Sequence, residues 1–306
     1  MAGMSPAAER DAWPPLPLAE WKDTYRTLHR WTQMVGKVQL ALTPRTNHFW
    51  NATLRADARG LTTMAMPLGG GACTMAFDFV DHVLRIDLDR GDRREIPLAP
   101  QPIADFYERF MAALRSLGIP ARIWPMPVEV PDPVRFDRDT TGAYDAEAVE
   151  RFWRILVRVE AILGEFRGRF IGKSSPVHFF WGSFDLAVTR FSGRPAPPRP
   201  GADAVTREAY SHECNSAGWW PGGGAIDGPA FYAYAAPEPA GLSDARIGPG
   251  PAFYSPDMKE FIYRYDDMRA APDPRAALLE FLQTTYEAEA TLAQWDRPAL
   301  ERPGSA

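Results

Sequence analysis

The segment Pro67-Leu68-Gly69-Gly70-Gly71, followed by Ala76-Phe77-Asp78-Phe79, has a counterpart later in the chain. Pro221-Gly222-Gly223-Gly224 precedes Ala230-Phe231-Tyr232-Ala233-Tyr234 in the same way. In both places a glycine turn leads into a short run rich in aromatic residues, which is typical of a β-strand. The two segments therefore predict that one turn-and-strand motif occurs twice.

Three further pairs of landmarks surround these segments in the same order. They are Val35-Gly36-Lys37 with Ile171-Gly172-Lys173, Phe49-Trp50 with Phe180-Trp181, and Ala99-Pro100-Gln101-Pro102 with Ala271-Pro272-Asp273-Pro274. Both members of the last pair open a stretch of helical spacing with proline at its first position. We predict an α+β protein of two tandem helix–antiparallel-strands–helix units, related by a pseudo-twofold internal duplication and packed as one compact body. Coincidence of short words such as Gly-Gly-Gly is the alternative.

These patterns divide the chain into five parts. The parts are a disordered or late-docking leader (1–17), a first unit (18–118), a proline-rich strap (119–144), a second unit (145–295) and a tail (296–306).

Each unit has its own expected elements. The first should contain a helix over 18–35 that Gly36 ends, followed by strands at 38–42, 48–56, 61–66, 75–80 and 83–88. In the second, residues 177–191 predict one long central strand, because they are apolar on both faces. Residues 194–204 are rich in proline and predict a loop.

Composition and charge exclude several classes of function. The net charge of −5 argues against nucleic-acid binding, which needs a basic surface. The sequence contains no run of about 18 apolar residues, so we expect no membrane span. The N-terminus lacks the apolar core of a signal peptide. Cys73 and Cys214 are too few for a disulfide scaffold or a cysteine-rich zinc site. We expect a cytoplasmic protein without nucleic-acid or membrane partners, whose oligomeric state the sequence leaves open.

Gly172-Lys173-Ser174 invites comparison with a phosphate-binding loop. That motif needs four residues between its first glycine and Gly-Lys-Ser/Thr, on a loop that leads from a strand into a helix. Gly168 is one residue too close, and here the helix comes first. We therefore identify no nucleotide-binding motif.

Four residues of the second unit are the candidate catalytic groups. His178 and His212 lie on expected strands, with Asp185 and Glu213 near them in sequence. His178, His212 and Glu213 together could hold a divalent metal ion with open positions, or the groups could exchange protons without a metal. In regular strands, His178 and Asp185 point to opposite faces, and so do His212 and Glu213. A complete site therefore needs a bulge, for example at Gly182, or a residue from another element. The alternative is that these groups satisfy buried backbone atoms.

Aromatic residues of the second unit are the candidate ligand-binding groups. Trp219 and Trp220 stand beside the glycine turn and could form a pocket wall, and Trp181 and Tyr210 lie near the candidate catalytic residues. From the first unit, Asn47 and His48 could reach the same pocket.

Several strings give the chain a resemblance to a known family. They are Thr27-Leu28-His29-Arg30-Trp31-Thr32-Gln33, Ile123-Trp124-Pro125-Met126-Pro127, Gly172-Lys173-Ser174-Ser175-Pro176-Val177-His178-Phe179-Phe180-Trp181-Gly182-Ser183-Phe184-Asp185 and Ala209-Tyr210-Ser211-His212-Glu213. In these strings the chain resembles a bacterial family of uncharacterised proteins, the domain-of-unknown-function family 5996. The resemblance covers nearly the whole chain and implies no established activity.

The residues therefore predict a small-molecule pocket in the second unit. A metal-assisted or acid–base hydrolytic reaction is the first interpretation. The alternative is a non-catalytic ligand-binding or protein-interaction function that uses the aromatic surface and the strap at 123–134.

Overall fold

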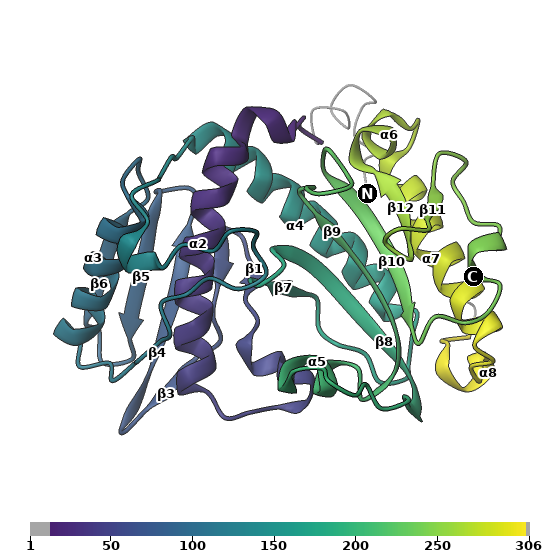
Figure 1. Ribbon diagram of the computed structural model, residues 1–306, viewed down its shortest axis with the longest axis horizontal. Helices are drawn as coiled ribbons and strands as arrows, with labels where there is room; N and C mark the ends of the chain where they lie inside the picture. Colours follow the sequence, from purple (N-terminus) through teal and green to yellow (C-terminus); the bar gives the residue numbers. More distant parts are fainter. Residues whose placement is uncertain (1–12, 304–306) are drawn as a thin grey trace. The chain divides into compact units, whose positions relative to one another are not determined.

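The computed structural model describes residues 13–303, which form two compact units (Figure 1). The N-terminal unit contains residues 19–157 and 179–184, and the C-terminal unit contains residues 13–18, 158–178 and 185–303. The chain passes between them inside helix α4 (Ala146–Gly168), and also between residues 18 and 19, 178 and 179, and 184 and 185. Helices accompany two antiparallel sheets, so the predicted α+β class is confirmed.

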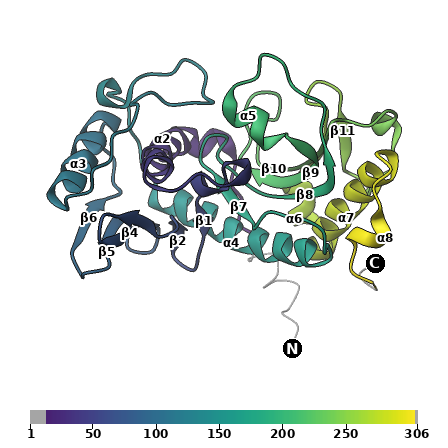
Figure 2. The same cartoon turned by 90° about the horizontal axis from the view of Figure 1, so that it is seen from below.

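The N-terminal unit is built on a sheet with the strand order β1-β2-β4-β5-β6, in which β3 also pairs with β4. Figure 2 shows α2 and α3 on the same side of this sheet. The expected hairpin is present as β4 and β5, in which Phe77 pairs with Leu84. The elements are α2 (Leu18–Leu42), η1 (Asn47–Ala52), β1 (Arg55–Ala56), β2 (Gly60–Thr62), β3 (Met66–Leu68), β4 (Gly71–Asp78), β5 (Val83–Leu88), β6 (Arg93–Pro97), α3 (Ile103–Ser116) and η2 (Phe136–Arg138).

The first helix is longer than predicted. It continues through Gly36 to Leu42, so the expected helix end at Gly36 and the expected strand at 38–42 are both wrong. A Cβ atom on Gly36 would overlap the indole of Trp181, so the glycine allows close packing rather than a helix end. Gln39, inside the extension, donates to the carbonyl oxygens of Asn51 at 2.7 Å and Thr53 at 2.6 Å.

The strand expected at 48–56 is mostly absent. Residues Asn47–Ala52 form the kinked 3-10 segment η1, in which His48 and Phe49 both have a φ of 57°. Only Arg55–Ala56 pairs as a strand. The left-handed backbone at two adjacent residues is incompatible with a regular strand.

The C-terminal unit is built on the second sheet, with the order β11-β12-β10-β9-β8-β7. Figure 2 shows α6 and α7 on one side of this sheet and the short helix α5 on the other. Asp273 accepts from the Ala276 N–H and Pro274 follows it, as the sequence predicts for the start of α7. The elements are β7 (His178–Phe180), β8 (Asp185–Pro195), α5 (Ala204–Ala209), β9 (His212–Trp220), β10 (Ala230–Ala236), η3 (Leu242–Asp244), β11 (Phe253–Ser255), β12 (Glu260–Arg264), α6 (Tyr265–Ala270), α7 (Pro274–Leu292) and α8 (Arg297–Leu300).

The predicted long strand over 177–191 is interrupted. Residues 181–184 form a turn in which Phe184 has a φ of 61° and its N–H donates to the Phe180 carbonyl at 2.7 Å. The chain therefore reverses where a single bulge was expected. Helix α5 follows the proline-rich loop and was not predicted.

The described part of the leader is packed. Trp13 is 5% exposed, its ring lies 6.3 Å from that of Tyr265, and the Tyr265 hydroxyl donates to the Pro14 carbonyl at 2.9 Å. Residues 1–12 of the expected leader and 304–306 of the expected tail lie outside the described residues.

The internal duplication is not confirmed. Both sheets are antiparallel, but the glycine triplets that suggested the repeat have different backbones. Gly222, Gly223 and Gly224 have φ values of 93°, 138° and 59°, whereas the triplet at 69–71 lies outside the left-handed region. The duplication therefore stays a hypothesis.

Candidate functional site

The two faces of the C-terminal sheet differ in chemistry. Strand register places Phe231 and Trp219 side by side on the face that carries the aromatic core beneath α6 and α7. The opposite face is polar, and we call it the tyrosine face. Its residues are Asp185 and Thr189 from β8, Ser216 and Trp220 from β9, Tyr232 and Tyr234 from β10, and Glu260 from β12.

Tyr232 and Asp185 are joined across an intervening strand. The Tyr232 hydroxyl donates a hydrogen bond to the Asp185 carboxylate, although β9 lies between their strands. Gly218 of β9 makes this possible, because a Cβ atom there would lie only 2.7 Å from the Tyr232 hydroxyl oxygen. Burial, followed by the negative charge of Asp185, raises the pKa of Tyr232 well above its ordinary value. Tyr232 is therefore a neutral hydroxyl that donates to the Asp185 carboxyl group.

A second pair of hydroxyl groups extends the polar array. The Tyr210 and Tyr234 hydroxyls are 2.9 Å apart, and the Tyr234 ring is stacked on that of Tyr232 with centroids 6.1 Å apart. Trp220 meets Tyr232 edge to face at 6.1 Å. The four rings form a continuous aromatic surface that carries hydroxyl groups.

Glu260 is the unusual ionisable group of this face. It is half-buried, and its side chain has no hydrogen bond or ion pair with any residue between Trp13 and Pro303. Burial, and then the charge of Asp185, raise the pKa of Glu260 from 4.5 to about 7. A carboxylate with a pKa near neutrality can both accept and release a proton under physiological conditions.

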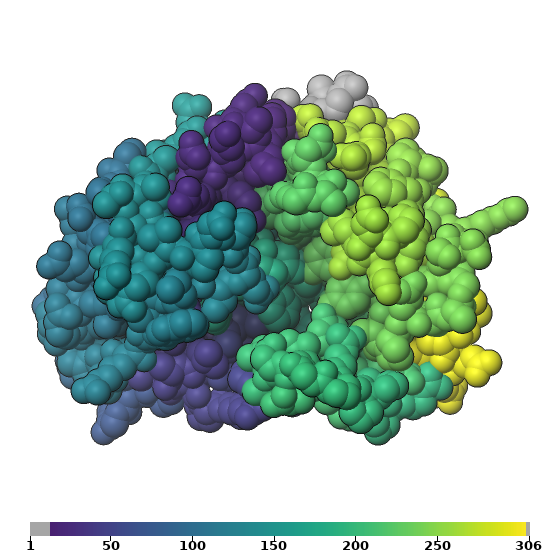
Figure 3. Space-filling view, in the orientation of Figure 1, coloured from purple at the N-terminus to yellow at the C-terminus, as the bar shows by residue number. Residues whose placement is uncertain are grey.

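A cavity of about 370 Å³ adjoins this face at Tyr210. It is lined by the proline-rich loop at 196–200 together with Arg207, Tyr210 and Ser211. The Arg199 guanidinium lies 4.0 Å from the centroid of the Tyr210 ring. Figure 3 shows the loop and α5, in green, at the surface of the molecule.

The helix-covered face of the same sheet also contains polar groups, but they are enclosed. Arg190 is 1% exposed, and its guanidinium lies 3.4 Å from the centroid of the Phe166 ring. Burial lowers its pKa to about 9. Glu289 of α7 is also 1% exposed, accepts from the Asn215 amide, and has a pKa raised by burial to about 8. Because these groups have almost no contact with solvent, we place the candidate site on the tyrosine face.

The structure brings some of the predicted site residues together. Asp185 and Trp220 lie on the tyrosine face, and Tyr210 reaches it through Tyr234. His212 is half-buried at the first position of β9, and its Nδ1 lies 3.0 Å from the Ser211 hydroxyl.

Other predicted residues of this unit lie elsewhere. Glu213 points to the opposite face from His212 and accepts from Arg194 Nε at 2.8 Å. Trp219 is fully buried in the aromatic core, so its indole has no surface to offer a ligand. His178 is 2% exposed on β7. Within residues 13–303, no three histidine, cysteine or acidic side chains are placed to hold a metal ion.

Three predicted ligand-binding residues belong to the N-terminal unit. Asn47 and His48 lie in η1, where the His48 ring is buried and 5.0 Å from that of Trp50. The Trp181 indole lies against Gly36 and donates to the Ala52 carbonyl at 2.5 Å. These contacts hold His48 and Trp181 within their own unit, whereas Asn47 is exposed.

Sequence reasoning missed Glu260, Tyr232 and Tyr234 as site residues. The two tyrosines are separated by one alanine on a strand, and that spacing places both on one face. This signal was available in the sequence. No sequence pattern indicates Glu260. What distinguishes this glutamate is the lack of a polar partner among the described residues, and that depends on the tertiary structure.

Comparisons with known proteins identify a family and supply no activity. A family model described as a family of unknown function (DUF5996) matches residues 13–302. The chain therefore belongs to this family. No curated protein and no solved structure matches it. Among the described residues, no helix combines the length and apolar character needed to cross a membrane.

Proposed function

We propose that the tyrosine face binds a small organic molecule and that Glu260 exchanges a proton with it or with an attacking water molecule. The observation that carries this proposal is the state of Glu260, a partly accessible carboxylate that has no polar partner among the described residues and lies on the sheet face that also carries Tyr232 and Tyr234. Structural carboxylates are normally paired or hydrogen-bonded when they lose water. A half-buried carboxylate that is left unpaired is a candidate for a functional role.

The reaction class that fits best is hydrolysis by general-base catalysis. Glu260 would take a proton from water while the water oxygen bonds to the electrophilic carbon of the substrate, and the leaving group would depart with its bonding electrons. The hydroxyl groups of Tyr210 and Tyr234 would hydrogen-bond the substrate. A base with a pKa of about 7 is suited to this step at neutral pH.

Hydrolysis of p-nitrophenyl acetate by the full chain tests the proposal. Because the base must be ionised, the rate above the uncatalysed background should rise about tenfold per pH unit below pH 7 and level off above it. Glu260→Gln should abolish that rate at every pH. A rate that is unchanged in Glu260→Gln would refute the catalytic role.

A matched control comes from the N-terminal unit. Glu108 is an exposed glutamate on α3, so Glu108→Gln removes one carboxylate from the other unit and leaves the C-terminal sheet unchanged. It should hydrolyse the ester like the original chain. Equal losses in both variants would indicate a nonspecific effect of charge.

A second candidate function, protein interaction, is favoured by Trp124 on the strap. This indole is 64% exposed, although the strap is fixed by the Gln33 amide, which donates to the Val128 carbonyl and accepts from the Val128 N–H, both at 2.8 Å. A rigidly held, exposed tryptophan is typical of binding surfaces. Trp124→Ala should abolish partner capture without changing ester hydrolysis if this function exists.

The expected cytoplasmic location belongs to the same proposal. Cys73 and Cys214 are both free and buried, which is the usual state of cysteines in a reducing compartment. Cell fractionation tests this location, and recovery of the protein outside the cytoplasm would contradict it.

A further inference from the structure

The cavity beside Tyr210 is lined by basic and apolar groups and by no acidic residue. Its basic groups are Arg199 from the proline-rich loop and Arg207 from α5. Neither guanidinium forms an ion pair with any residue between Trp13 and Pro303. Two cations without acidic partners therefore share one cavity, in a chain whose net charge is −5.

The acidic residues of the surrounding elements leave this positive charge in place. The Asp203 carboxylate accepts from two backbone N–H groups and one hydroxyl at the start of α5. Glu208 does not line the cavity. Burial raises the pKa of Tyr210, and the positive charge of Arg199 opposes this rise more strongly than the charge of Glu260 adds to it. The nearest charge to act on the inner wall of the cavity is therefore positive.

The two arginines are held by a stiff segment of the chain. The loop at 196–200 has prolines on both sides of Arg199, and proline fixes the backbone φ angle. The first N–H of this loop donates to the Ser211 carbonyl at 3.0 Å, which joins the loop to the end of α5. The Arg207 guanidinium donates to the Ala202 carbonyl. Donors that are positioned before a ligand arrives lose little freedom when they bind it.

We infer that this cavity binds an organic acid, whose carboxylate or phosphate group is held by Arg199 and Arg207 and whose apolar body lies against Tyr210 and the loop prolines. Guanidinium groups present planar donors that match both kinds of oxyanion. The cavity volume of about 370 Å³ suits a small organic molecule, and an inorganic anion would leave most of it empty.

This inference rests on the binding part of the proposed function, because the cavity adjoins the tyrosine face at Tyr210. It adds the chemical class of the ligand, and it does not require that the chain hydrolyse an ester. A neutral ester can bind the same surface, but it lacks the group that the two arginines recognise.

Four compounds test the charge and the size of the ligand: phenylacetate, phenyl phosphate, benzyl alcohol and inorganic phosphate. Each is titrated into isotope-labelled full-length protein, and the amide chemical shifts are followed by NMR. At least one of the two organic acids should shift the amides of residues that line the cavity and bind about tenfold more tightly than benzyl alcohol. The difference between the two acids tells which oxyanion the arginines prefer.

Substitutions of the arginines test which groups hold the acid. Arg199→Gln and Arg207→Gln should each weaken the preferred acid about fivefold and leave benzyl alcohol unchanged, because each removes one charged donor at a solvent-accessible site. Arg207→Lys keeps the charge without the planar donors and should recover part of the affinity. Arg109→Gln is the matched control, because Arg109 is exposed on α3 and forms no ion pair with a described residue. It should bind the acid like the original chain.

Four outcomes would overturn the inference. If benzyl alcohol binds as tightly as the acids, the cavity does not select negative charge. If inorganic phosphate binds as tightly as phenyl phosphate, the arginines hold an adventitious ion only. Equal losses in Arg109→Gln and Arg199→Gln would show a general effect of charge. If no probe shifts the amides around the cavity, it is not an acid-binding site.

The ester assay keeps the proposed function separate from this inference. Hydrolysis that depends on Glu260, without binding of either acid, would contradict the inference alone. Binding of an acid that depends on Arg199 and Arg207, without ester hydrolysis, would contradict the catalytic role alone.

Discussion

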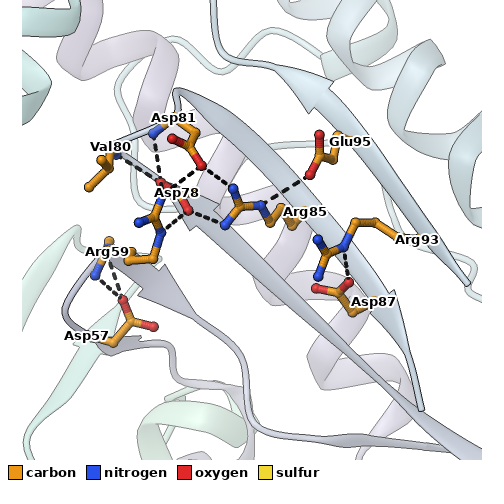
Figure 4. A network of polar contacts seen from close by, with 10 residues as sticks. Asp57, Arg59, Asp78, Val80, Asp81, Arg85, Asp87, Arg93 and Glu95 are labelled. Carbon is orange, nitrogen blue, oxygen red and sulfur yellow. Dashed lines mark hydrogen bonds and ion pairs between the residues drawn. The ribbon is translucent and has the colours of Figure 1, made fainter. Parts of the chain in front are cut away.

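Asp78 in the N-terminal sheet and Glu260 in the C-terminal sheet are both carboxylates at the end of a strand, and their surroundings are opposite. Asp78 is the last residue of β4 and is 1% exposed. Its two oxygens accept from the guanidinium groups of Arg59 and Arg85 and from the N–H groups of Val80 and Asp81 (Figure 4). Burial acts to raise the pKa of Asp78, but these hydrogen bonds outweigh it and hold the pKa below its usual value.

The network around Asp78 extends across the outer strands of the sheet. Arg85 also pairs with Asp81 and with Glu95 at 3.2 Å. A separate ion pair on the same strands joins Arg93 to Asp87 at 2.5 Å. Figure 4 shows these side chains following one another along β4, β5 and β6. Every acidic group in this chain of contacts has a basic partner, which is the pattern of a carboxylate that stabilises a fold.

Glu260 has the same chemistry but lacks these partners. Burial, and then the charge of another carboxylate, Asp185, raise the pKa of Glu260, so this pKa moves in the opposite direction from that of Asp78. The difference teaches that burial alone does not separate structural from functional acids, because Asp78 is the more buried of the two. What separates them is whether the fold itself supplies the compensating charge.

The strongest test of the comparison is Asp78→Asn. This substitution leaves two guanidinium groups facing an amide, so it should lower the free energy of unfolding by about 3 kcal/mol. The lower end of the usual range applies because both arginines keep some contact with water. Urea unfolding measures the change. Asp92→Asn is the matched control, because its pair with Arg90 is exposed and should contribute less than about 0.5 kcal/mol.

The sequence predicted much of the fold, but it did not reveal the difference between Asp78 and Glu260. Period-2 alternation located β4 and β5, and proline positions located the starts of α3 and α7, because these signals are local. The extension of α2 through Gly36 was missed, because the reason for that glycine is an indole 145 residues later in the chain. Likewise, the partners that Asp78 has and Glu260 lacks come from other strands.

The candidate site was predicted only in part for the same reason. Asp185, Tyr210 and Trp220 were selected because they lie in distinctive segments, and strand register brings them to one face. Glu213 was selected for its proximity to His212 in sequence, but adjacent residues on a strand point to opposite faces. Strand register and turns decide which side chains share a face of the sheet. Neither can be read from one short segment of sequence.

Gly218→Ala sharpens the comparison by acting on the Tyr232–Asp185 pair. The new methyl group would lie 2.5 Å from the Leu186 carbonyl oxygen and 2.7 Å from the Tyr232 hydroxyl oxygen. The strands must shift to accept it, so stability should fall by about 2 kcal/mol. Thermal unfolding measures this loss. Gly164→Ala in α4, where a methyl group meets open space, should instead stabilise the chain by about 0.5 kcal/mol.

Glu260→Gln tests the other side of the comparison, because here removal of a charge should stabilise the protein. The folded-state pKa of about 7 is higher than the ordinary 4.5, so between these values the folded chain holds a proton that the unfolded chain releases. The contribution of Glu260 to stability is therefore present below pH 4.5 and is lost as the pH rises to about 7. Glu260→Gln lacks this loss and should be about 1 kcal/mol more stable than the original chain at pH 8.

The measurement for Glu260→Gln is urea unfolding at pH 4 and pH 8. The two proteins should be nearly equally stable at the lower pH, and the variant should gain its advantage only at the higher pH. Glu289, with a pKa raised by burial to about 8, adds its own dependence to both proteins. The charge of Glu260 also raises the pKa of Glu289, so the difference between the proteins reports Glu260 together with its effect on Glu289. A variant that is less stable than the original at pH 8 would show that Glu260 has a stabilising partner and would remove the contrast with Asp78.

Tyr210→Phe should have the smallest effect, because the Tyr210 hydroxyl is half-buried and bonds to a single neutral partner. Loss of its hydrogen bond to Tyr234 should cost about 0.5 kcal/mol, since water can replace part of it. Tyr107→Phe is the control, because the Tyr107 ring packs on Phe136 while its hydroxyl bonds to no other described residue, and no change is expected. A loss for Tyr210→Phe as large as that for Asp78→Asn would mean that the tyrosine face stabilises the fold, and the contrast between a structural and a functional polar cluster would no longer hold.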